Sequence, residues 1–159
     1  MPVTTLQWLL ALHVTGAFLL LGGAAMSSVL GVLAYRAERP SEVALYLGLA
    51  RVAVPFIIVG SLLTLVLGLW LVHEASFDYA SFWVIASIVL WVAAGGAGSR
   101  GGEREDKVRR YALELAASGD EPSTELSARL RDPRTAVLSW GSLIAILALL
   151  ALMVWKPGA

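Results

Sequence analysis

The stretch LQWLLALHVTGAFLLLGG, from Leu6 to Gly23, is almost wholly apolar and carries one ionisable side chain, that of His13. No Asp, Glu, Lys or Arg follows until Arg36. A helix rises about 1.5 Å per residue, so about 20 such residues cross the hydrocarbon core of a bilayer. The segment before this run has no basic residue of the kind that opens a secretory signal. We therefore expect a retained membrane-spanning helix here.

The composition of the whole chain agrees with a membrane protein. Its 159 residues are 58% hydrophobic and only 15% charged, with a mean hydropathy of +0.75. Soluble domains are about half apolar and about a quarter charged. The chain has no cysteine, which excludes disulfides, thiolate metal sites and thiol catalysis. Its net charge of zero gives no support for nucleic-acid binding, so the lipid bilayer is the expected partner.

Four apolar runs are long enough to cross the bilayer once each. They cover residues 6–35, 44–72, 79–98 and 136–155, and a more polar connection covers residues 99–135. These runs predict an all-α integral membrane four-helix bundle that forms a single domain over residues 1–159. The first two runs exceed the length that a crossing requires, so we expect them to tilt or to extend beyond the membrane.

The distribution of Lys and Arg predicts the direction of these spans. Eleven of the twelve basic residues lie in the first connection, at the edge of the second run or in the third connection, and the exception is Lys156. An excess of basic residues marks the cytoplasmic side, so both termini should lie outside. Aromatic residues of the kind that gather at a membrane boundary should lie near the outer side: Trp8, Trp70, Phe77, Tyr79, Phe82, Trp83 and Trp155.

Small residues recur at helical spacing in the first two runs. Gly60, Thr64 and Gly68 follow one another at intervals of four, as do Gly23 and Ser27. Such faces let two helix backbones approach closely in a membrane, where the hydrophobic effect between helices is absent. We expect these five residues to make helix–helix contacts.

The polar connection contains an amphipathic pattern. Val108, Tyr111, Ala112, Leu115 and Ala116 share one face of a helix predicted from about Glu103 to Ala117. A second short helix is expected between Pro122 and Asp132, with Leu126 and Leu130 on its inner face. The preceding GGAGSRGGE segment, residues 95–103, is expected to be a flexible exit from the third span.

Three interpretations of this cytoplasmic helical segment are open. It could pack as a helical hairpin under the bundle, lie on an anionic lipid surface through its Arg and Lys side chains, or bind a partner protein.

The two histidines are the candidate ligand-binding residues. No acidic or basic residue lies deep in any run, which argues against a proton or ion pathway. No set of nucleophile, base and acid can be assembled around the two histidines and Glu74, which argues against catalytic hydrolysis. His13 and His73 could be the two axial ligands of a b-type haem. Their depths in the membrane can be compared by counting residues along each helix from the turn between them. If Arg36 and Arg51 mark one membrane boundary, the two histidines lie at the same depth. If the count starts from the turn at Pro40, their depths differ by about five residues, or about 7 Å.

Two alternatives to haem are open for the same histidines. They could be structural, with His13 hydrogen-bonded to a neighbouring helix and His73 at the solvated end of the second span. A copper or zinc ion would require a third ligand, for which Glu74 is the nearby candidate.

Four segments carry a family resemblance: WLLALHVTGAFLLLGG, ERPSEVALYLGLARVAVP, GLWLVHEA and ALMVWKPGA. They resemble a bacterial family of predicted four-helix integral membrane proteins of the actinobacterial type, known as domain of unknown function 2269. The resemblance implies a multi-pass protein of the bacterial cell membrane and carries no activity with it. LHVTGAFLLLGG is also similar to copper-resistance D-type and haem-binding four-helix membrane proteins, whose helices place histidines where His13 lies.

The sequence thus favours a non-catalytic structural or accessory membrane component without a cofactor. Such a component would associate with itself, as a homo-oligomer, or with a membrane partner protein. The alternative from another class is a membrane redox protein that holds haem b between His13 and His73.

Overall fold

The computed structural model describes residues 4–157, which form five helices and no strand. These are α1 (Thr5–Arg36), α2 (Pro40–Glu74), α3 (Phe82–Ala117), α4 (Thr124–Leu130) and α5 (Pro133–Trp155). The four long helices are apolar enough to cross a membrane. The predicted all-α membrane architecture is confirmed, and the outermost residues of the domain expected over 1–159 lie outside the described part.

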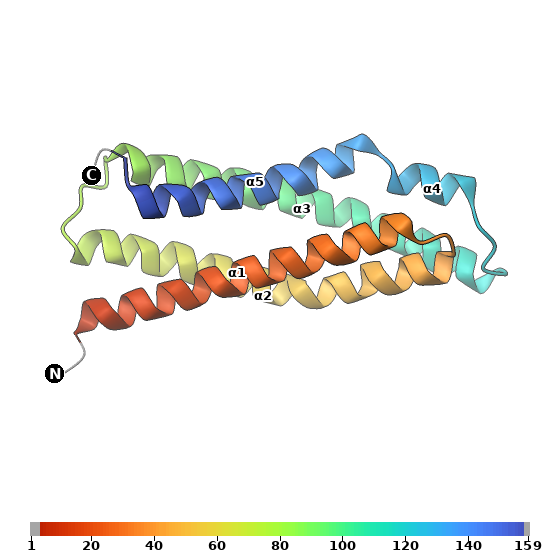
Figure 1. Cartoon of the computed structure of the whole chain (residues 1–159), viewed down its shortest axis with the longest axis horizontal. Helices are drawn as coiled ribbons and strands as arrows, with labels where there is room; N and C mark the ends of the chain where they lie inside the picture. Colours follow the sequence, from red (N-terminus) through yellow and green to blue (C-terminus); the bar gives the residue numbers. More distant parts are fainter. Residues whose placement is uncertain (1–3, 158–159) are drawn as a thin grey trace.

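The helices pair as two antiparallel hairpins, α1 with α2 and α3 with α5 (Figure 1). α1 begins and α5 ends at the same end of the molecule, while the α1–α2 turn and α4 lie at the other (Figure 1). We call the latter the basic end, because eleven of the twelve Lys and Arg residues lie on the segments that reach it. The side of the membrane that each end faces stays a prediction.

Polar and proline residues set the helix starts. Thr4 and Gln7 form a capping box at the start of α1. α2 and α5 begin with Pro40 and Pro133, because the first turn of a helix tolerates a residue without an N–H donor. The Asp132 side chain accepts a hydrogen bond from the backbone N–H of Arg134 and so caps α5.

The glycine-rich segment at residues 95–103 lies inside α3, so the prediction of a flexible exit there is wrong. Glycine has a low helix propensity in isolation, and packing against α5 overrides it here. A Cβ atom on Gly98 would lie 3.2 Å from Oγ of Ser142, and one on Gly101 would lie 3.4 Å from Oγ of Ser139. The glycines therefore bring α3 and α5 close together, and the helix predicted over 103–117 is the last part of α3.

The first two helices extend beyond the length of a single crossing. α1 has 32 residues and α2 has 35, whereas about 20 residues cross the hydrocarbon core. At the basic end they pack with the last turns of α3 and with α4 around seven buried residues, Ala34, Val43, Ala44, Leu47, Val108, Ala112 and Leu126. Tyr111, Leu115 and Leu130 pack against this core. The predicted inner faces are confirmed, and the segment packs as part of the bundle.

The loop between α3 and α4 is joined to the start of α2. Asp120 accepts hydrogen bonds from the backbone N–H and from the hydroxyl of Ser41, both at 2.7 Å. Arg39, which precedes α2, provides no side-chain cap of its own. Asp120 adopts a left-handed backbone conformation, with φ of 60°, next to Gly119 with φ of 140°. These hydrogen bonds lower the pKa of Asp120 and connect the two hairpins at the basic end.

Candidate functional site

The interface between α1 and α2 has no room for side chains at three glycines. A Cβ atom on Gly60 would lie 2.7 Å from the carbonyl oxygen of Gly16, and one on Gly16 would lie 2.9 Å from Cβ of Leu63. A Cβ atom on Gly23 would lie 2.8 Å from Cγ1 of Ile57. The hairpin is therefore closed by direct backbone approach.

The other small residues of the predicted set have different surroundings. Thr64 is buried next to this interface, and its hydroxyl donates to the carbonyl oxygen of Gly60 at 2.7 Å within α2. Gly68 faces the ring of His13, and Ser27 is half-buried beside a cavity that α1 borders. Gly16 was not predicted from the sequence, although its spacing of seven residues from Gly23 places both on one face of α1.

The two histidines lie at different levels of the bundle. Cε1 of His13 would lie 2.9 Å from a Cβ atom on Gly68, so His13 is level with that glycine. His73 follows Gly68 by five residues, about 7.5 Å along the helix, and its side chain is exposed. This is the offset that the count from Pro40 predicts. A haem held between these two imidazoles stays a prediction.

Buried polar atoms without a hydrogen-bond partner include Nδ1 of His13, Nε1 of Trp83 and Oγ of Ser87. Within residues 4–157, no three His, Asp or Glu side chains are grouped as a metal ion would require. Glu74 therefore does not join the histidines in a three-ligand group in the described part of the chain.

A cavity of about 1400 Å³ lies between the two hairpins. α1, α2, α3 and α5 line it, and Leu20, Ala24, Ala94 and Ile146 form the apolar cluster where the hairpins meet beside it. α1 and α5 barely contact one another, so the bundle is not closed on that side. Along α2 the lining extends from Leu47 to Thr64, about 25 Å of helix. The cavity is thus a long, mainly apolar space.

Few polar contacts join the hairpins across the apolar part of this space. Nε1 of Trp91 on α3 donates to Oγ of Ser61 on α2 at 2.8 Å. Within the second hairpin, the hydroxyl of Ser142 donates to the carbonyl oxygen of Ala94 at 3.0 Å. Both hydrogen bonds satisfy polar groups that would otherwise be costly to bury in a membrane.

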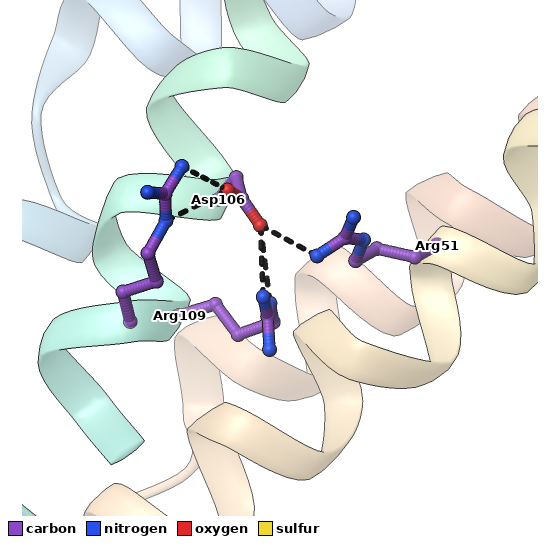
Figure 2. A network of polar contacts seen from close by, with 4 residues as sticks. Arg51, Asp106 and Arg109 are labelled. Atoms are coloured by element: carbon purple, nitrogen blue, oxygen red, sulfur yellow. Dashed lines mark hydrogen bonds and ion pairs between the residues drawn. The ribbon is translucent and has the colours of Figure 1, made fainter. Parts of the chain in front are cut away.

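Charged side chains gather at the basic end of the cavity. Figure 2 shows the group around Asp106, which includes Arg51 and Arg109. Asp106 of α3 accepts hydrogen bonds from Arg51 of α2 at 3.0 Å, from Arg109 at 3.1 and 3.2 Å, and from Arg110 at 2.5 and 2.9 Å. We call these four residues the arginine cluster. It contains three positive charges and one negative charge, so its net charge is +2.

The arginine cluster lies at the expected boundary of the membrane. Residues 52–72, which follow Arg51, contain no acidic or basic residue and form about 31 Å of helix. That length equals the thickness of the hydrocarbon core, about 30 Å. A second ion pair, between Arg104 and Asp132 at 2.9 Å, joins α3 to the start of α5. We therefore expect Arg51 to lie at the level of lipid headgroups.

The comparison with known families agrees with this architecture. Residues 7–157 match the family described as "Predicted integral membrane protein (DUF2269)". The chain belongs to this family. The match covers nearly the whole of all five helices and confirms the resemblance seen in the sequence. No curated protein and no solved structure matches the chain, so the similarity to copper-resistance and haem-binding proteins has no support from these comparisons.

Proposed function

We propose that the protein is a non-catalytic accessory component of the bacterial cell membrane that holds an amphipathic molecule of the bilayer between its two hairpins. The observation that carries this proposal is the cavity of about 1400 Å³. It exceeds the range of about 300–1000 Å³ that is usual for small-molecule sites. An amphipathic occupant suits it, since the lining is mainly apolar and ends in a charged cluster.

The contrast between the two kinds of helix contact supports this proposal. Within each hairpin, glycines allow close approach, as Gly60 does in the first and Gly98 in the second. Between the hairpins, the helices leave a long space. An empty space of this size would lose dispersion contacts along its whole lining, so occupation by a lipid-like molecule is favoured.

The placement of the charges supports a non-catalytic role. The ion pairs formed by Arg51, Arg104, Arg109 and Arg110 lie at the basic end and not in the apolar interior. Their partners Asp106 and Asp132 are engaged by guanidinium groups or by a helix start. These charged groups thus connect helices or cap a helix, which agrees with a binding protein.

A pair of leucine substitutions tests the proposal. Gly95 lines the cavity, and a Cβ atom there would meet nothing within 4 Å, so Gly95→Leu should fill space without a clash. Gly22 also faces open space but does not line the cavity, which makes Gly22→Leu the matched control. Amphiphiles that copurify with the intact protein are measured by native mass spectrometry in detergent. We expect Gly95→Leu to reduce them and Gly22→Leu to leave them unchanged, and equal retention in both variants would overturn the proposal.

A further inference from the structure

The arginine cluster has unused hydrogen-bonding capacity. A guanidinium group has five N–H donors. Arg51 uses one N–H toward Asp106, while Arg109 and Arg110 each use two. Asp106 therefore accepts five hydrogen bonds, and most of the fifteen donors of the three arginines have no bond to this carboxylate. A single carboxylate cannot neutralise three guanidinium groups, so the cluster is suited to a further anion.

All four members of the cluster line the cavity. The wider lining also has an excess of positive charge, with six basic residues, Arg51, Lys107, Arg109, Arg110, Arg129 and Arg131, against four acidic ones, Glu103, Glu105, Asp106 and Asp132. The hydroxyl of Ser139 on α5 donates to Glu105 on α3 at 3.2 Å, so this acid has a hydrogen-bond partner within the second hairpin. Arg129 is also paired with Glu125, which lies outside the lining, at 2.6 Å. Six basic residues against these five acidic ones leave an excess of one positive charge, which favours an anion at this end of the cavity.

We infer that the cavity binds an anionic phospholipid, with its phosphate on the arginine cluster and an acyl chain between the hairpins. This inference rests on the proposed function and names the ligand class of that site. Arg51 supplies the decisive group, because it comes from the first hairpin and its side chain is 59% exposed. Its guanidinium can bind a phosphate oxygen without losing the bond to Asp106.

The dimensions agree with a lipid of the leaflet at the basic end. One leaflet accounts for about half of the 30 Å hydrocarbon core, or about 15 Å. The cavity lining on α2 continues from Arg51 to Thr64, about 20 Å along the helix. An acyl chain that begins at the headgroup level of Arg51 therefore has enough apolar length beside it.

Competition between two lipids tests this inference. The full-length protein in detergent is given equal amounts of phosphatidylglycerol and phosphatidylcholine with identical acyl chains, and native mass spectrometry measures the ratio retained. We expect phosphatidylglycerol to be favoured. Arg51→Gln should lower the ratio about fivefold, since one basic residue near an anionic lipid contributes about that factor. Adding Arg109→Gln should lower it further, while Arg51→Lys should retain part of the preference because it keeps the charge.

Arg36→Gln is the matched control, because Arg36 lies at the basic end in the last turn of α1 but does not line the cavity. Its ratio should equal that of the unmodified protein. An equal fall in Arg36→Gln and Arg51→Gln would overturn the inference, since it would indicate a diffuse charge effect. Retention of another protein chain in place of lipid would also overturn it.

The Gly95→Leu variant separates this inference from the proposed function. If both lipids are retained equally and Gly95→Leu reduces both, the cavity binds amphiphiles and the anionic assignment fails. If Gly95→Leu reduces neither lipid, the proposed function fails as well. If it reduces phosphatidylglycerol most, and Arg51→Gln removes that preference, both are supported.

Discussion

Gly60 is the position where a single methyl group should matter most to the first hairpin. A Cβ atom there would meet backbone atoms of Gly16 and Leu20, which cannot move aside as a flexible side chain can. We expect Gly60→Ala to lower the free energy of unfolding by about 1–3 kcal/mol, the usual cost of overpacking. Thermal or denaturant unfolding in detergent micelles measures the change.

Gly48, on the same helix, is the control for this substitution. A Cβ atom on Gly48 would meet nothing within 4 Å. Gly48→Ala should therefore be neutral or stabilise the helix by up to about 1 kcal/mol, because alanine has the higher helix propensity. Equal destabilisation by both substitutions would contradict the close approach of α1 and α2 at Gly60.

The histidines give a second prediction for single residues. His13 packs against Gly68, while His73 lies five residues further along α2 and is exposed. We expect protein purified from haem-replete cells to be colourless and unable to take up added hemin. His13→Ala and His73→Ala should leave this behaviour unchanged. A Soret band that shifts on dithionite reduction and disappears in both variants would establish the haem alternative.

At the scale of elements, the contact between Asp120 and the start of α2 predicts a dependence on pH. The two hydrogen bonds from Ser41 favour the charged carboxylate, so the pKa of Asp120 in the folded protein lies below its ordinary value of 3.8. Their stabilising effect is therefore complete above that ordinary value, and it is lost as the pH falls through the lower folded pKa. Amide hydrogen exchange in the first turn of α2 should lose protection when the pH is lowered from about 6 to below that folded pKa.

Asp120→Ala should produce the same loss of protection at neutral pH, because it removes the acceptor. Glu121→Ala removes the same charge from the neighbouring position and forms no side-chain hydrogen bond to α2, so it should leave the first turn protected. Equal loss in both variants would show that charge in the loop, and not the cap, protects this turn.

The elements also show which parts of the fold the sequence can predict. Helical periodicity was sufficient to predict the helix at residues 103–117 and the inner position of Leu126. It was insufficient to predict that residues 95–103 are helical. The glycines there give this segment a low helix propensity, but Gly98 and Gly101 pack against α5. Close approach depends on a partner more than 30 residues away, which local sequence does not reveal.

At the scale of the whole molecule, the candidate site follows from how the hairpins are placed. The positions of the basic residues in the sequence predict that they gather at one end of the bundle. They do not predict the hydrogen bond of Arg51 to Asp106, because it joins positions 55 residues apart. The cavity likewise depends on contacts between four helices. The small-residue faces of α1 and α2 are used within the chain, so association with a second copy or a partner protein stays a prediction.

The direction of the whole bundle is tested by thiol labelling, since the chain contains no cysteine. Ser76 lies in the exposed turn between α2 and α3, and Ser118 lies in the exposed loop after α3 at the basic end. Eleven of the twelve basic residues lie on the segments that reach the basic end, and this distribution predicts that the basic end faces the cytoplasm. We expect a membrane-impermeant maleimide to label Ser76→Cys in intact cells and to label Ser118→Cys only after permeabilisation. The reverse pattern would invert the topology and place the arginine cluster in the outer leaflet.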